Sequence, residues 1–230
     1  MRIVFVRHGQ PNYELNCLTD LGRLQAQAAA ERLKEEGIEE IYSSPFGRAL
    51  ETAQYAARGL GIENIRILDF MHEIYCGSPE GKPVFANGNP WDAAEELVRL
   101  GFDLSRPDWT EQPAFLNNMV AGEAARVARE LDAWLEGLGY RREGLYYRCT
   151  HHDEKQRTVA LFSHGGSSTC ALAHLFNMTF PYACLMTRTQ FTGVTVVRLG
   201  DESGSLTMPH FEILSDARHI LFDPAGLEKD

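Results

Sequence analysis

Two histidines follow apolar runs of the same kind at distant points in the chain. One lies in Arg7-His8-Gly9 after residues 3–6, and the other in Ser163-His164-Gly165 after residues 159–162. Short, continuous apolar runs are typical of buried parallel strands. If the two strands are neighbours in one sheet, both imidazoles lie at its carboxyl edge, where ligands bind in open α/β sheets.

Two further groups point to the same edge. Arg48 begins the helix that follows the second predicted strand, and Glu73 comes shortly after the third. Guanidinium forks match phosphate oxygens, and a neutral imidazole is a competent nucleophile toward phosphorus. A second imidazole, if protonated, can donate to a developing charge, and a carboxylic acid can protonate a leaving oxygen. The set therefore predicts phosphoryl transfer that needs no metal.

The elements that must position these groups alternate in type. Strands at residues 3–6, 38–42 and 65–68 are separated by helices at about 20–36 and 47–60, which predicts a parallel sheet with right-handed crossovers. Residues 71–121, rich in Pro, Gly and Asn, are too long for a plain connection and predict an inserted cap with one helix at 91–100. The cap's aromatic residues could line a pocket or merely attach the cap to the core.

The C-terminal half predicts a second set of elements. A helix at 123–138 is followed by strands at 145–149 and 158–163 that are joined by a polar turn, and then by a helix at 167–176. Residues 194–199 and 206–214 predict a closing hairpin, and Pro209 predicts that its second strand lies at a sheet edge.

The polar turn His151-His152-Asp153-Glu154 could suggest a metal site. Adjacent side chains in an extended turn point in opposite directions, so the two imidazoles cannot easily share one ion. We interpret the turn as the solvated tip of a hairpin and expect no metal site.

Composition limits the partners and the compartment. The formal net charge of −10 argues against a nucleic-acid or phospholipid surface, and an anionic substrate would need a local basic pocket. The five scattered cysteines include no CxxC pair, which favours reduced thiols in a cytoplasmic protein. We identify no signal peptide and no membrane span. The sequence predicts no oligomeric state.

The ordered motifs resemble the histidine phosphatase superfamily, in its phosphoglycerate mutase-like branch. Two positions depart from the family pattern: Cys76 replaces the usual aromatic before Gly77, and His72 adds an ionisable group beside Glu73. The matching blocks are Arg7-His8-Gly9, Leu18-Thr19-x-x-Gly22-x-x-Gln25-Ala26, Ser43-Ser44-Pro45-x-x-Arg48-Ala49-x-x-Thr52-Ala53, Glu73-x-x-x-Gly77-x-x-Glu80-Gly81, Gly122-Glu123 and Ser163-His164-Gly165-Gly166.

The resemblance implies a role for each matching residue. His8 would be the phosphorylated nucleophile and Glu73 the general acid and base. Glu80, Glu95 and Glu96 are nearby alternatives for the acid. The phosphate pocket and the substrate side would be formed by Arg7, Arg48, His164, Gly165, Asn12, Gln10 and Thr19.

The resemblance also implies a fold and an activity. We expect one domain over residues 1–230, a three-layer α/β/α sandwich on a mostly parallel sheet, with a cap at about 74–121. The leading hypothesis is a metal-independent phosphomonoester hydrolase without a cofactor, acting on a small phosphorylated metabolite. A phosphoglycerate mutase-type transferase and a non-catalytic phosphate-binding module are the alternatives. Residues 82–121 hold only Lys82, Arg99 and Arg106 as cations, which favours the hydrolase.

Overall fold

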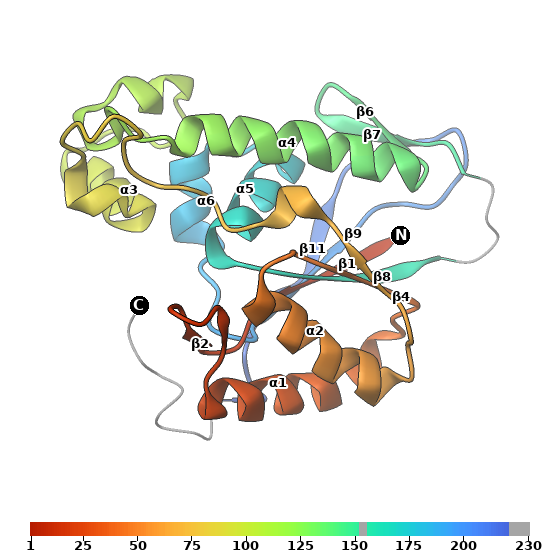
Figure 1. The fold of residues 1–230 in the computed structure, drawn as a ribbon. Coiled ribbons are helices and arrows are strands. Elements are labelled where there is room, and N and C mark those ends of the chain that lie inside the picture. The colour runs from red at the N-terminus through yellow and green to blue at the C-terminus, as the bar shows by residue number, and fades with distance from the viewer. Residues whose placement is uncertain (152–155, 221–230) are drawn as a thin grey trace.

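The computed structural model describes residues 1–151 and 156–220 (Figure 1). The strands of the main sheet are β1 (Arg2–Arg7), β4 (Glu40–Ser43), β5 (Ile65–Ile67), β8 (Thr158–Ser163), β9 (Val194–Arg198) and β11 (His210–Asp216). The minor strands are β2 (Pro11–Asn12), β3 (Cys17–Leu18), β6 (Tyr140–Glu143), β7 (Tyr146–Cys149) and β10 (Leu206–Thr207). The α-helices are α1 (Asp20–Leu33), α2 (Gly47–Leu60), α3 (Pro90–Arg99), α4 (Val120–Gly137), α5 (Gly165–Leu175) and α6 (Phe180–Met186).

Within the described residues, the main sheet has six strands in the order β11-β9-β1-β8-β4-β5. Strands β1, β8, β4 and β5 are parallel to one another, and β9 runs antiparallel to both of its neighbours. Arg7 lies opposite Ser163 in the β1–β8 register, so the residues that follow each strand emerge side by side. The predicted mostly parallel sheet and the adjacency of the two histidine-bearing strands are confirmed.

Helices cover both faces of the sheet (Figure 1). Val4 and Val6 of β1 join a buried cluster with residues of α1 and α2, whereas Ile3 and Phe5 join a cluster with residues of α4 and α5. Because successive strand side chains point to opposite faces, one apolar strand contributes to both halves of the core. This is the predicted α/β/α sandwich.

The join between β1 and α1 depends on two glycines. A Cβ on Gly9 would lie 2.5 Å from the carbonyl oxygen of Gly22, and a Cβ on Gly22 would lie 2.1 Å from that of Gln10. These distances are too short for any side chain, so both positions require glycine. Gly9 is therefore needed for close backbone packing, and it does not adopt a positive φ.

The cap lies between the short turn η2 (Asp69–Met71) and α4 (Figure 1). It contains η3 (Phe85–Gly88), α3, η4 (Pro107–Glu111) and η5 (Pro113–Phe115). Its aromatics serve two purposes. Trp109 and Phe115 are buried against each other with ring centroids 4.9 Å apart and attach the cap to the core. Trp91, at the start of α3, lines a cavity.

The structure corrects one predicted pairing, divides one predicted strand and adds elements that were not predicted. Strands β7 and β8 do not form a hairpin, because β7 belongs to a separate sheet, β10-β7-β6, and β8 lies in the main sheet. Residues 206–214 split before and after Pro209 into β10 and the edge strand β11, which does pair with β9. Strand β6, the short hairpin β2–β3 and helix α6 were not predicted. No helix in the described ranges is long and apolar enough to cross a membrane.

Candidate active site

His8 follows β1 directly, and only 2% of it is exposed. Its Nδ1 lies 2.7 Å from the carbonyl oxygen of Gly9, which can only accept, so Nδ1 carries the ring proton and Nε2 keeps its lone pair. Burial lowers the pKa of His8 to about 3; the Gly9 hydrogen bond opposes this shift, and the charges of Arg7 and Arg48 reinforce it. His8 is therefore neutral at physiological pH, as a nucleophile must be.

Arg48 lies in the first turn of α2 and is buried against His8. Its Nε–H points at His8 Nε2 over 3.3 Å, and its Nη1 donates to Asn16 Oδ1 over 2.8 Å. The rings of Phe46 and Tyr13 flank the guanidinium, with centroids 5.1 and 5.5 Å from Cζ. Burial lowers the pKa of Arg48. A largely desolvated cation at this position favours an anion beside the imidazole.

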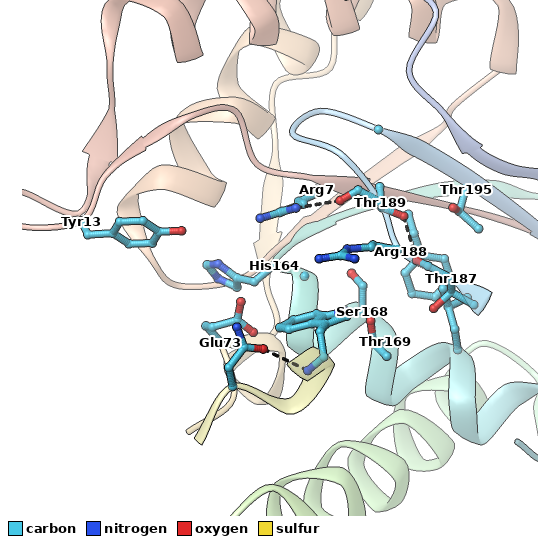
Figure 2. A pocket seen from close by; sticks show the side chains of 16 residues that line it. Arg7, Tyr13, Glu73, His164, Ser168, Thr169, Thr187, Arg188, Thr189 and Thr195 are labelled. Carbon is cyan, nitrogen blue, oxygen red and sulfur yellow. Dashed lines mark hydrogen bonds between the residues drawn. The ribbon is translucent and has the colours of Figure 1, made fainter. Parts of the chain in front are cut away.

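Arg7, the last residue of β1, is held from the opposite side. Its Nη1 donates to the carbonyl oxygen of Thr189 over 2.7 Å, and its Cζ lies 4.3 Å from the centroid of the Phe191 ring. These partners come from the segment between α6 and β9. The fork is therefore fixed at the sheet edge and extends toward the same cavity as His164 (Figure 2).

His164 follows β8 and is fully buried, with its ring centroid 5.1 Å from that of His8. Its Nε2 lies 2.7 Å from Ser44 Oγ, which also accepts from the backbone N–H of Phe46. When Ser44 donates its proton to Nε2, the ring proton of His164 lies on Nδ1. Among the described residues Nδ1 has no hydrogen-bond partner. Burial, with the neighbouring His8 and Arg48, lowers the pKa of His164, so the ring is neutral and offers one donor.

Glu73 reaches the site from the segment after η2. Its Oε1 accepts from the N–H groups of Ile74 (2.9 Å) and Ser167 (3.0 Å), and its Oε2 accepts from Gly166 (3.4 Å). A Cβ on Gly166 would lie 2.7 Å from Glu73 Oε1, so this approach requires glycine. Burial raises the pKa of Glu73, although these hydrogen bonds and Arg48 oppose the shift. The carboxyl group therefore holds a proton more readily than an ordinary glutamate.

The three alternative carboxylates lie elsewhere. Glu80 pairs with Lys82, Glu95 with Arg188 and Glu96 with Arg99, and none of the three lines the cavity in the described part of the chain. Glu73 does line it.

The cavity beside these groups has a volume of about 180 Å³ (Figure 2). Of the residues expected at the site, Arg7, Glu73, His164 and Gly165 line it. Its remaining wall comes from β1, the loop between β2 and β3, the α3 end of the cap, α5, the segment after α6 and β9. These residues are Phe5, Tyr13, Asn89, Trp91, Ser168, Thr169, Leu172, Thr187, Arg188, Thr189, Gly193 and Thr195.

A family model for the histidine phosphatase superfamily (branch 1) matches residues 3–209. The chain belongs to this superfamily. The membership confirms the resemblance carried by the ordered motifs, and the fold agrees with it.

Of two curated relatives, one is named mutase-like and the other a mutase. Phosphoglycerate mutase-like protein 4 from Arabidopsis thaliana is 29% identical over 215 residues, covering 86% of this chain and 80% of the relative. A 2,3-bisphosphoglycerate-dependent phosphoglycerate mutase from Thermoplasma acidophilum is 24% identical over 169 residues, covering 69% and 74%.

Similar solved structures are named as phosphatases. A mycobacterial glucosyl-3-phosphoglycerate phosphatase in complex with inorganic phosphate has a TM-score of 0.63 and 26% identity, covering 95% of this chain and 98% of its own. A phosphoserine phosphatase from Entamoeba histolytica has a TM-score of 0.59, with 96% and 99% covered, and at 21% identity it supports the fold alone.

Three residues expected on the substrate side, Gln10, Asn12 and Thr19, do not line the cavity in the described part of the chain, and neither do Arg48 and His8. Thr19 caps α1 by accepting from Gly22 N–H, and its hydroxyl donates to Gln10 Oε1 over 2.8 Å. Asn12 Oδ1 accepts from Leu15 N–H within the same loop. They shape the loop that carries Tyr13 and Asn16 to the site.

Sequence reasoning missed several residues of the site. Asn16 contacts Arg48 and has a φ of 50°, a left-handed conformation that asparagine tolerates. Thr187, Arg188 and Thr189 follow α6, whose Thr179 cap and Pro181 were available as signals. Without that helix, the segment could not be placed against β1. The His152-Asp153-Glu154 part of the polar turn lies outside the described residues, and His151 contacts the Tyr140 hydroxyl.

Proposed function

We propose that this protein is a metal-independent phosphomonoester hydrolase that works through a phosphohistidine at His8. The observation that carries the proposal is the neutral His8, with its Nε2 lone pair 3.3 Å from the Arg48 fork and the protonatable carboxyl group of Glu73 in the same site. Nucleophile, anion-binding groups and acid are thus present together.

The reaction then has two steps. His8 Nε2 attacks phosphorus, the bond from phosphorus to the ester oxygen breaks, and Glu73 gives its proton to that oxygen as the alcohol leaves. Water next attacks the phosphohistidine, the Glu73 carboxylate accepts the water proton, and the P–N bond breaks to release phosphate. Glu73 donates one proton in the first step and regains one in the second, so it ends the cycle in its starting state.

The donor set supplies the charge stabilisation that a metal provides in other phosphatases. Arg7 and Arg48 carry two positive charges, and the Nδ1–H of His164 adds a directed donor that no described residue uses. Donors fixed before the reaction stabilise charge on the equatorial oxygens without reorganisation. An oxygen of the substrate phosphate would accept a hydrogen bond from the buried Nδ1–H.

We expect hydrolysis of para-nitrophenyl phosphate to be unchanged after dialysis against excess EDTA. The physical reason is that protein cations neutralise the phosphate in the mechanism above. Phosphate release before and after dialysis is the measurement, with a known zinc phosphatase as the positive control for chelation. Complete loss of activity, restored by added divalent metal, would refute the metal-free mechanism.

The mutase alternative differs in where the phosphoryl group goes. Returning it to a second substrate oxygen requires the intermediate to remain bound, and further cations would hold its second phosphate. The three cations of residues 82–121 are exposed and paired with neighbouring carboxylates, namely Lys82 with Glu80, Arg99 with Glu96 and Arg106 with Asp108. This arrangement favours the hydrolase. Incubation with 3-phosphoglycerate, with and without a bisphosphate primer, distinguishes released phosphate from isomerised product.

Arg188 favours substrates that carry a second negative charge. A phosphate dianion would be matched by Arg7 and Arg48, which leaves Arg188 as an additional cation on the cavity wall (Figure 2). Its described ion pair, to the exposed Glu95, spans 3.4 Å and contributes little to stability. A single planar fork suits a carboxylate. We therefore propose phosphorylated carboxylic acids as the substrate class, in line with the name of the similar glucosyl-3-phosphoglycerate phosphatase.

For Arg188→Met, we expect kcat/KM for phosphoserine to fall by roughly 10- to 100-fold, the effect of losing one charge-assisted hydrogen bond. Phosphoethanolamine, the same ester without the carboxylate, should be almost unaffected. Arg198→Met is the matched control. Arg198 lies opposite Arg2 at the amino end of β1, whereas the site lies at the carboxyl end of that strand. Equal losses for the two esters would contradict the carboxylate assignment, and a preferential loss for bisphosphates would indicate a second phosphate instead.

A further inference from the structure

Glu73 lies on a segment without regular structure, between the end of η2 at Met71 and η3 at Phe85. A general acid must be held within hydrogen-bond distance of the leaving oxygen. The bonds to Ile74, Gly166 and Ser167 hold its carboxylate, but they do not hold the backbone that carries it. Another part of the protein must fix residues 70–77.

Two side chains of α4 bind this backbone on both sides of Glu73. Arg126 Nη1 donates to the carbonyl oxygen of Phe70 over 2.6 Å, and Glu123 Oε2 accepts from the N–H of Tyr75 over 3.4 Å. The two side chains are joined to each other, with Arg126 Nη2 2.8 Å from Glu123 Oε2. We call Glu123 and Arg126 the α4 clamp.

The clamp is protected from water. Glu123 and Arg126 have side-chain exposures of only 13% and 21%, whereas Arg129, three residues further along the same helix, is 67% exposed. A partly buried ion pair with fixed geometry constrains its surroundings more than a solvated one. Burial raises the pKa of Glu123, but the hydrogen bond and charge of Arg126 outweigh it and keep the pKa lowered. The clamp therefore stays ionised at neutral pH.

Neighbouring contacts extend the same attachment. His72 lies between the carbonyl oxygen of Asp69, 2.7 Å from its Nδ1, and Glu123 Oε2, 4.0 Å from its Nε2. At the other end, Gly77 donates to Asn118 Oδ1 and accepts from Met119 N–H, just before α4 begins. The segment that carries Glu73 is thus attached along its length to one end of α4.

We infer that Glu123 and Arg126 are positioning residues, which hold the backbone around Glu73 so that its carboxyl group can protonate the leaving oxygen. This inference rests on the proposed function, because it presumes that Glu73 is the acid. It also gives a role to the Gly122-Glu123 motif, which the phosphate chemistry leaves unused.

The test compares substrates that need the acid with one that does not. For Arg126→Met, we expect kcat/KM for phosphoserine to fall by roughly 10- to 100-fold, because a displaced acid loses part of its contribution. Para-nitrophenyl phosphate, whose leaving group departs without protonation, should lose no more than about threefold on the same reasoning. Arg126→Lys should recover part of the loss, since one ammonium can reach only one of the two partners.

The pH profile of kcat/KM separates positioning from stabilisation of the fold. A clamp that only stabilised the fold would leave this profile unchanged. In the clamp variant, Glu73 becomes more hydrated and its raised pKa falls toward the usual value. The alkaline limb of kcat/KM for phosphoserine should therefore shift to lower pH. Arg129→Met, on the solvent side of α4, should leave both substrates and the profile unchanged.

Two results would overturn the inference, and they are distinguishable. In the first, Glu73→Gln lowers kcat/KM for phosphoserine far more than for para-nitrophenyl phosphate, but Arg126→Met lowers both equally and leaves the alkaline limb in place. The clamp then supports the fold only. If Glu73→Gln itself fails to separate them, the acid assignment fails and the positioning role fails with it. If Arg126→Met does not fold, as judged by circular dichroism, Glu123→Gln and Arg126→Lys give the same comparison, because both keep part of the contacts.

Discussion

Replacing His8 with alanine is expected to lower turnover of every phosphomonoester by about 10⁴-fold or more and to abolish the phosphoenzyme. Alanine keeps the backbone turn after β1 but removes the Nε2 lone pair beside Arg48. The remaining arginines can still bind phosphate, so KM or phosphate affinity should change far less than kcat. Acid-labile labelling from a radioactive substrate measures the intermediate directly.

The matched control for this substitution is His210→Ala. His210 is an exposed histidine on the edge strand β11. It pairs with Arg198, which lies opposite Arg2 at the amino end of β1, away from the site. It should retain full activity and full labelling. Undiminished labelling in His8→Ala would show that another residue accepts the phosphoryl group. Retained turnover without labelling would instead show direct attack by water and end the phosphohistidine proposal.

Local patterns in the sequence were sufficient to predict that His8, His164 and Arg48 come together. The strand before His8 and the strand before His164 are apolar on both faces, because helices cover both sides of the sheet. Parallel neighbours align their carboxyl ends, so the convergence of the two rings followed from strand pairing alone. Arg48 followed in the same way from its place in the first turn of α2.

The substrate half could not be predicted, because it is made of tertiary contacts between irregular segments. Trp91 lines the same cavity as Thr187 and Arg188 because α3 packs against α6. Helix α6 has only seven residues and no periodic signal. The loop of residues 10–19 illustrates the same limit. Its polar residues Gln10, Asn12 and Thr19 fit a phosphate site by type, but their hydrogen bonds are used within the loop.

The false hairpin of β7 and β8 has a related cause. A polar turn between two apolar strands favours a hairpin when only neighbours in sequence are considered. Strand β8 pairs instead with β1 and β4, where all six of its residues are buried, whereas Tyr146 and Arg148 of β7 keep some exposure. In the sequence, the continuous apolar run of residues 159–162 was the available signal that β8 belongs in the centre of a parallel sheet.

Glu73→Gln is expected to divide substrates by leaving group. For phosphoserine, kcat/KM should fall by about 10²- to 10⁴-fold, the usual contribution of a general acid. For para-nitrophenyl phosphate, kcat/KM should change little, because it reports only the steps up to transfer onto His8. Glutamine can still accept from Ile74 and Ser167 through its amide oxygen, so the segment should stay in place.

The same variant should also accumulate the intermediate. Glu73 is needed a second time as the base toward water, so phosphohistidine should form quickly from the activated ester and decay slowly. Rapid mixing would then show a burst of nitrophenol equal to the enzyme concentration, followed by a slow phase. Glu96→Gln, which alters an exposed pair with Arg99, is the matched control and should show no burst.

The pH dependence of kcat/KM tests whether Glu73 is the group that supplies the proton. Because burial raises the pKa of Glu73, the acid remains protonated above the usual range of a glutamate and is lost as pH rises through that raised pKa. The wild-type profile of kcat/KM for phosphoserine should therefore have an alkaline limb that the glutamine variant lacks. The pKa of His8 is about 3, so its protonation should not limit activity until far below neutral pH. A limb that persists unchanged in Glu73→Gln, with equal losses for both esters, would assign the proton to another group.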